Sequence, residues 1–186
     1  AKNKNLICAY YRDAAFLNPL RAVDDSMTIS YSTPGSQDAP YLHANATGFR
    51  LPTLTEWELA ARYRADTNHD GDIADPGEYY PGNCASGALS TNASEANRFA
   101  VYTDDTTPPV APVGSKEPNS LGIHDMSGNV WEYCYDWPDP TKATIMGGCA
   151  SFEYTLVQIG NIIALPPYFT THNGGLRIAI TATMNK

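Results

Sequence analysis

The acidic stretch from residue 66 to residue 78 carries residue types that bind a hard divalent cation. Oxygen-bearing side chains alternate along it: Asp66, Asn68, Asp70 and Asp72. Gly71 stands where a calcium loop of the EF-hand type turns sharply. Gly77 occupies the place of the closing bidentate glutamate, and Glu78 follows one residue later. The first half of the stretch therefore predicts a Ca²⁺ site, while the second half leaves a solvated acidic loop as the alternative.

A second carboxylate suited to chemistry is Glu132. Residues 130–137 alternate, with the aromatic side chains on one face of an expected strand and Val130, Glu132, Cys134 and Asp136 on the other. A carboxylate among such neighbours requires a cation, backbone donors or a metal. An edge-strand residue that faces water is the alternative interpretation.

The remaining reactive residue types form no recognisable catalytic set. The sequence has four cysteines that lie far apart and form no CxxC motif: Cys8, Cys84, Cys134 and Cys149. A zinc knuckle or a thioredoxin-type site is therefore not expected, and free thiols are favoured over disulfides. The histidines have no spacing typical of a metal triad or a nucleophile–base pair: His43, His69, His124 and His172.

One helix that must position these groups is clearly marked. Thr53 and Glu56 have the spacing of a capping box, and apolar residues then recur with helical period. This predicts a helix from Leu54 to about Arg64. Arg50 lies just ahead of it and is expected to pair with an acidic residue, with a solvated arginine as the alternative.

Weaker patterns suggest three further elements. We expect a short amphipathic helix within residues 3–17 and a short strand at residues 28–32. A terminal strand is expected after the turn at Gly174 and Gly175.

Composition limits the classes of partner. The chain has 186 residues, a formal charge of −8 and a pI near 4.8. The negative charge argues against a nucleic-acid partner, because phosphates would be repelled. No apolar run reaches the ~18 residues of a membrane span, and no signal peptide is visible.

The segment 149–172 mixes apolar, aromatic and polar side chains without a clear period. Glycine pairs flank it, which suggests an exposed binding face, with an irregular buried connection as the alternative. The candidate ligand-binding residues are Ser151, Phe152, Glu153, Tyr154, Leu156, Ile162, Leu165, Tyr168, Phe169, Thr171 and His172.

Four motifs in order resemble one known family. They are RLPTLTEWELAAR, APVGSKEPNSLGIHDMSGNVWEYCYDW, GGCAS and GLRIAI. Together they are similar to the formylglycine-generating-enzyme type of C-type lectin fold. The resemblance implies an α+β fold, irregular, with few helices and short antiparallel strands. It also implies a single domain over 1–186, with the family's N-terminal part missing from this chain.

The resemblance allows an enzymatic interpretation to be tested on the residues. Formylglycine-generating enzymes oxidise a substrate cysteine with Cu(I) held by two thiolates, which are ligands that suit this soft ion. Counted from Gly147 and Gly148, the two cysteines would fall at Phe152 and Val157. We therefore expect no copper and no catalysis, with a formylglycine-generating or related oxidase of the same fold as the alternative function.

The variable proteins of diversity-generating retroelements, of the Treponema type, use the same scaffold for binding. The resemblance to them implies a non-catalytic surface protein in which 149–172 is a hypervariable recognition face for an unknown macromolecular ligand. It implies an extracellular location, with a lipid anchor upstream of this chain. A structural or assembly module, with Tyr168 and Phe169 buried against a sister chain, is the third hypothesis.

The family also implies structural Ca²⁺. One ligand set would comprise Asn97, Asp105 and the carbonyls of Arg98 and Thr107. Another would comprise Glu132 and the carbonyls of Gly128 and Val130. Sugar binding is not implied, because the EPN triplet at 117–119 falls in a turn of the family pattern.

Overall fold

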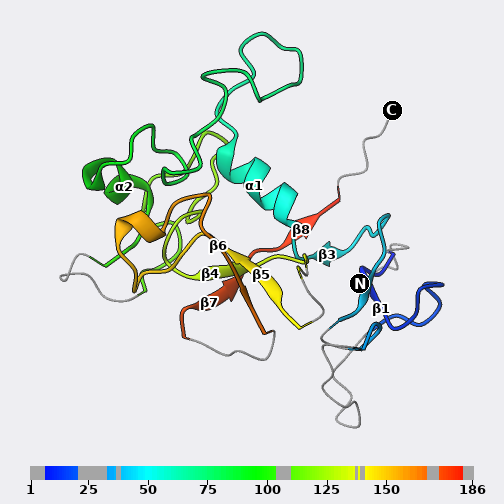
Figure 1. Cartoon of the computed structure of the whole chain (residues 1–186). Helices are drawn as coiled ribbons and strands as arrows, with labels where there is room; N and C mark the ends of the chain where they lie inside the picture. The colour runs from blue at the N-terminus through cyan, green and yellow to red at the C-terminus, as the bar shows by residue number, and fades with distance from the viewer. Residues whose placement is uncertain are drawn as a thin grey trace.

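The computed structural model describes residues 7–20, 33–36, 39–103, 110–136, 138, 141–166 and 172–181. Within these ranges the chain forms two α-helices, one 3₁₀ helix and eight short strands (Figure 1). This confirms the predicted α+β class with few helices and short strands. The strand expected at residues 28–32 lies outside the described residues.

A four-stranded sheet forms the centre of the molecule, in the order β6-β5-β4-β7 (Figure 1). Its strands are β4 (Trp131–Tyr133), β5 (Ala143–Met146), β6 (Ile162–Leu165) and β7 (Gly174–Leu176). β5 is buried along its whole length and pairs antiparallel with both neighbours. β7 pairs parallel with β4, which was not expected. The strand predicted at 130–137 is shorter than expected, although backbone hydrogen bonds to Thr144 continue to Asp136.

Helix α1 (Leu54–Arg62) confirms the capping-box prediction. Thr53 Oγ1 accepts from the Glu56 N–H at 3.2 Å, and Glu56 Oε2 accepts from the Thr53 N–H at 2.9 Å. Arg50 pairs with Glu56 at 2.6 Å, as the sequence also predicted. The buried face of the helix presents Trp57 and Ala61 to a core cluster that includes Met126, Cys134, Met146 and Ile159.

Helix α2 (Ala93–Phe99) was not predicted from the sequence. Its N-cap is Asn92, whose side chain accepts from the Glu95 N–H at 2.8 Å. Ala96 and Phe99 are buried in a second core cluster that includes Val157. α2 lies beside the 3₁₀ helix η1 (Tyr154–Leu156), on the left of Figure 1.

The helix predicted within residues 3–17 is wrong for the described residues 7–17. Strand β1 (Tyr10–Tyr11) instead pairs with β2 (Tyr41–Leu42). After β1 the Asp13 carboxylate accepts backbone hydrogen bonds from Ala15, Leu17 and Asn18, which closes a turn. This local competition for backbone N–H groups opposes helix formation.

The predicted terminal strand is divided in two. Gly174 and Gly175 lie inside β7 instead of forming a turn before the strand. Arg177 and Ile178 lie outside any strand. The next strand is β8 (Ala179–Ile180), which pairs with β3 (Phe49–Arg50). Arg177 lies in this interruption, and its side chain donates to Glu132.

Candidate functional site

The candidate recognition segment, residues 149–172, is attached at both ends to residues in or next to strand β4, which belong to the frame that the rest of the domain forms. The Ala150 N–H donates to the Asn129 carbonyl at 2.9 Å, and the Trp131 N–H donates to the Asn173 carbonyl at 2.7 Å. Asn173 Nδ2 also donates to Ser151 Oγ at 3.1 Å. The segment therefore leaves and rejoins the sheet at one place.

Two side chains fix the middle of this segment to the core. Val157 and Ile159 are both fully buried, at 0% exposure. The Ile159 N–H donates to the Cys84 carbonyl at 2.9 Å, and the Gly160 N–H donates to the Gly82 carbonyl at 2.7 Å. The backbone of the segment is thus held at its centre as well as at its ends.

The predicted recognition residues lie mostly on the outside of this attached segment. Phe152, Leu156 and Ile162 are exposed by 36%, 43% and 47%. The others in the described residues divide into exposed Ser151, Glu153 and His172, and half-buried Tyr154 and Leu165. Tyr168, Phe169 and Thr171 lie outside the described residues.

Two further exposed residues were missed by the sequence analysis. Thr155 is exposed on η1, and Ile163 is 36% exposed on β6. β6 is an edge strand of the central sheet, and its first two residues, Ile162 and Ile163, are both exposed. The IIAL sequence of β6 is apolar throughout, and an apolar run alone does not distinguish an exposed edge strand from a buried one.

Two aromatic residues of the segment, the exposed Phe152 and the half-buried Tyr154, contact aromatic residues of the frame. Phe152 meets Trp131 edge to face, with ring centroids 5.9 Å apart. Tyr154 lies against Tyr102 at 6.1 Å. Such pairs add about 0.5–1.5 kcal/mol beyond burial, so these contacts help to hold both rings in position.

Glu132 lies in a buried network with a cation, Arg177. Arg177 Nη2 donates to Glu132 Oε1 at 2.8 Å, and Arg177 Nε donates to Oε2 at 2.9 Å. Trp57 Nε1 also donates to Oε2 at 2.7 Å, and Glu132 is only 5% exposed. The required partner is therefore present, and the water-facing alternative is wrong.

The ligand set expected around Glu132 gains one residue that the sequence analysis did not single out. Asp125 Oδ1 is buried without a hydrogen-bond partner, while Oδ2 accepts from the Gly114 N–H at 2.7 Å. Asp125, Val130 and Glu132 line one pocket of about 610 Å³. The orphaned oxygen fits a hard cation there, in competition with Arg177 for Glu132.

The other set fits a metal less well in the described residues. Lys116 Nζ donates to both the carbonyl and Oδ1 of Asn97, at 2.7 and 2.9 Å. An ammonium thus already occupies two of the expected oxygen donors. Asp105 and Thr107 lie outside the described residues.

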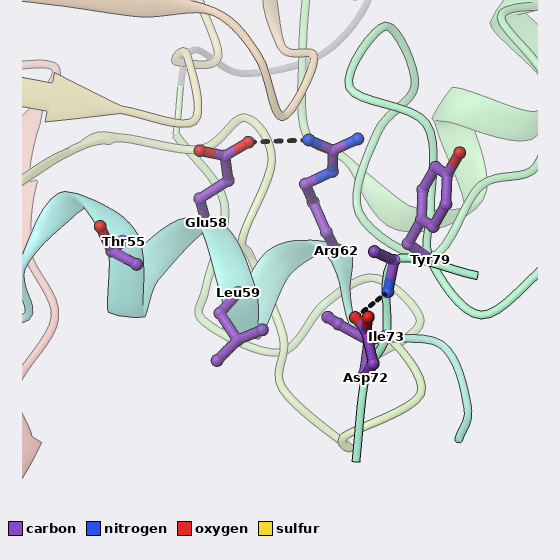
Figure 2. Close-up of a pocket in the computed structure, with 8 residues that line it drawn as sticks. Thr55, Glu58, Leu59, Arg62, Asp72, Ile73 and Tyr79 are labelled. Atoms are coloured by element: carbon purple, nitrogen blue, oxygen red, sulfur yellow. Dashed lines mark hydrogen bonds and ion pairs between the residues drawn. The ribbon is translucent and has the colours of Figure 1, made fainter. Parts of the chain in front are cut away.

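The acidic stretch forms a loop that projects beyond the end of α1, at the top of Figure 1. Asp72, Ile73 and Ala74 line one side of a pocket of about 450 Å³, and α1 lines the other (Figure 2). On α1, Glu58 and Arg62 are paired at 2.9 Å. Within the described part of the chain, no three His, Cys, Asp or Glu side chains converge to form a metal centre.

All four cysteines are free thiols, as the sequence analysis favoured. Burial, followed by the charges of Asp136 and Glu132, raises the pKa of Cys134 to about 12. Burial also raises the pKa of Cys84 and Cys149. A raised pKa favours the protonated thiol, whereas the thiolate is the form that acts as a nucleophile or metal ligand.

A family pattern described as sulfatase-modifying factor enzyme 1-like domain matches residues 13–182. A formylglycine-generating enzyme from Streptomyces coelicolor is 36% identical over 102 residues, which are 53% of this chain and 30% of that enzyme. Chaperone protein LppX from Paenibacillus barcinonensis is 35% identical over 104 residues, which are 52% of this chain and 34% of that protein. The matched parts are thus about a third of the length of each of these two relatives.

The solved structure of Treponema denticola variable protein 1 is similar over most of the chain. The TM-score is 0.69 at 25% identity, covering 95% of this chain and 63% of that one. These similarities confirm the predicted scaffold, which enzymes and a variable protein share. None of the helices in the described residues is long and apolar enough to cross a membrane.

Proposed function

Since the chain belongs to the sulfatase-modifying factor enzyme 1-like domain family, we propose that it is a ligand-binding member that does not oxidise cysteine. Its recognition face is formed by the exposed side chains of residues 151–172. The observation that carries this proposal is the division of the segment into buried anchors and exposed neighbours. Val157 and Ile159 are fully buried, whereas Phe152, Leu156 and Ile162 face outward.

The absence of suitable thiols at the relevant positions supports binding over catalysis. The two positions that correspond to the copper-holding cysteines are Phe152 and Val157. Val157 is packed in the core cluster that contains Cys84, and the pKa of Cys84 is raised by burial. Cu(I) requires soft thiolate ligands, which these positions do not supply.

The chemistry of the face suits a macromolecular ligand. Phe152 and Tyr154 offer large contact area with few rotatable bonds, as aromatic residues do in antibody loops. The apolar edge strand β6 adds Ile162 and Ile163. An edge strand with exposed backbone groups can also accept an extended peptide. We therefore propose a protein or peptide ligand.

Sequencing of the gene across many isolates tests the role of this face. Substitutions are expected to concentrate at the exposed positions of 149–172, with Val157, Ile159 and the flanking glycines unchanged. Residues 110–136 in the same reads provide the control. Variation spread evenly over both segments would contradict the proposal.

A copper titration distinguishes the proposed binding function from the alternative, an oxidase of the same fold. Anaerobic competition for Cu(I) with a chromogenic chelator is expected to show no binding by this chain, and oxygen uptake with a sulfatase cysteine peptide is expected to stay at background. Stoichiometric Cu(I) binding with peptide oxidation would establish catalysis instead.

The proposal includes a structural Ca²⁺ and a surface location. Asp125, Glu132 and the carbonyls of Gly128 and Val130 would hold the ion, and the orphaned Asp125 oxygen supports this assignment. We propose display on the cell surface, with the anchor in residues outside this chain. Surface labelling of intact cells with an impermeant reagent tests the location.

A further inference from the structure

The loop from Asp66 to Glu78 is closed at its base by backbone pairing. The N–H groups of Arg64 and Ala65 donate to the Glu78 carbonyl at 3.0 and 3.2 Å, and the Tyr80 N–H donates to the Arg62 carbonyl at 2.7 Å. The two ends of the loop are therefore fixed next to each other. The residues between them are mostly exposed and accessible to ions.

Glu78 is the exception, because its charged side chain is buried at 2% exposure. Its Oε1 accepts hydrogen bonds from both the backbone N–H and the hydroxyl of Thr67. Its Oε2 is buried and has no partner among the described residues. The nearby guanidinium of Arg64 bonds the Gly77 carbonyl at 2.9 Å and not this carboxylate.

A second orphaned oxygen lies at the other end of the same loop. Asp66 Oδ2 accepts from the Gly71 N–H at 3.2 Å, whereas Asp66 Oδ1 is buried without a partner. A buried carboxylate oxygen that makes no hydrogen bond is unfavourable unless a cation meets it. Two such oxygens at the ends of one short loop indicate a missing positive charge.

The remaining donors point to the same place. The Asn68 amide donates to both Asp70 Oδ2 and Asp75 Oδ2, at 3.0 and 2.9 Å, which gathers these side chains.

We propose that this loop binds one Ca²⁺ through the orphaned oxygens of Asp66 and Glu78, the side chains of Asn68 and Asp70, and the backbone carbonyl of Asp72. These ligands are all oxygen, which suits Ca²⁺, and their sequence spacing follows the first half of an EF-hand loop. Glu78 replaces the usual closing glutamate from one position further along. No three His, Cys, Asp or Glu side chains converge in the described residues, so binding requires side chains of the loop to move towards one another.

The pocket beside the loop gives this site a structural consequence. Asp72 and Ile73, on the loop side of the pocket, line it together with Leu59 and Tyr79 (Figure 2). A bound ion would fix the loop and hence that side of the pocket. The five acidic residues from Asp66 to Glu78, with no Lys or Arg among them, would lose most of their mutual repulsion.

Isothermal titration of the full chain with CaCl₂, after removal of metals with a chelator, tests this site. The Asp66→Asn and Glu78→Gln variants are expected to bind at least tenfold more weakly. The Asp72→Asn variant removes the same charge but keeps the carbonyl, and is expected to change affinity less than threefold. Equal weakening by all three would show general charge attraction and overturn the site.

A second readout locates the ion and does not depend on the loop variants. Limited proteolysis of the wild-type chain is expected to show Ca²⁺-dependent protection of residues 66–78, with MgCl₂ at equal concentration giving little. The Asp125→Asn variant should retain this protection, since it affects only the site near Glu132. Cleavage at the same rate with and without Ca²⁺ would overturn the proposal.

Discussion

Arg177 contacts both carboxylate oxygens of Glu132, at 2.8 and 2.9 Å, from a position 45 residues later in the sequence. The pair connects β4 to the end of β7, and the Trp57 indole N–H adds a bond from α1. One carboxylate therefore joins three elements around the core.

Removal of this carboxylate charge should strongly destabilise the fold. In Glu132→Gln the guanidinium of Arg177 loses its charged partner in a mostly buried place, and we expect a loss of about 3–5 kcal/mol in the free energy of unfolding. Urea unfolding provides the measurement. Glu58→Gln on the surface of α1 serves as the control and should change stability by about 0.5 kcal/mol or less. Equal effects of the two variants would show that the Glu132 network is not special.

The ion pair between Arg50 and Glu56 should make stability depend on acidity. The hydrogen bonds and charge of Arg50, with the cap at Thr53, lower the pKa of Glu56 from 4.5 to about 2. Because the pKa of Glu56 is lower in the folded state than in the unfolded chain, its ionised side chain stabilises the folded state fully above about pH 4.5. This stabilisation is lost as the pH falls through about 2. The Glu56 side chain is 45% exposed, so the effect is below about 1 kcal/mol.

Glu56→Gln isolates this charge, because glutamine still completes a capping box. The variant should be less stable than wild type at pH 7, and the two thermal midpoints should converge near pH 2. Thr53→Ala should instead lose about 1 kcal/mol with little dependence on pH. A constant difference between Glu56→Gln and wild type from pH 7 to pH 2 would exclude the proposed role of the charge.

Gly148 is expected to be intolerant of any side chain. Its φ is +74°, and an added Cβ would lie 2.5 Å from the Leu156 carbonyl oxygen. Gly122 has the same φ of +74° with nothing within 4 Å. Gly122→Ala should therefore cost only the conformational term of about 1–2 kcal/mol, and Gly148→Ala clearly more. Similar urea midpoints for the two variants would contradict this expectation, because they would show that the backbone at Leu156 and Val157 shifts easily to make room for the methyl group.

The anchors of the recognition segment should matter more for stability than its exposed residues. Ile159→Ala removes fully buried atoms and should cost about 2–5 kcal/mol. Leu156→Ala, at 43% exposure, should cost about 1 kcal/mol or less. Thermal unfolding of both variants makes the comparison. If Leu156→Ala proved the more damaging change, the face would be a packed interior surface and not a binding surface.

Local signals predicted some of the structure well. The Thr53–Glu56 capping box lies within four residues and was confirmed in full. The same kind of signal was present for α2, where Asn92 precedes Glu95 at cap spacing. This helix has only seven residues and few apolar side chains, so no helical period could be recognised in its sequence. The N-terminal helix failed because the Asp13 turn and the pairing of β1 with β2 outweighed a weak period.

Long-range features could not be read from the sequence. The need of Glu132 for a partner followed from its neighbours, but the choice of Arg177 depends on the parallel pairing of β4 and β7. The exposure of Ile162 and Ile163 depends on β6 lying at the sheet edge. Asp125 was missed because its orphaned oxygen arises only from the way the chain folds around it.

The attachment of Ala150 and Asn173 to neighbouring residues of the frame has a consequence for protein engineering. Because the two ends of the segment are held by residues close to each other in the frame, the residues between Ala150 and Asn173 can be replaced as one unit. We expect a replacement that keeps the two junctions and the buried Val157 and Ile159 to leave the scaffold folded, so that libraries of binders can vary the residues between them.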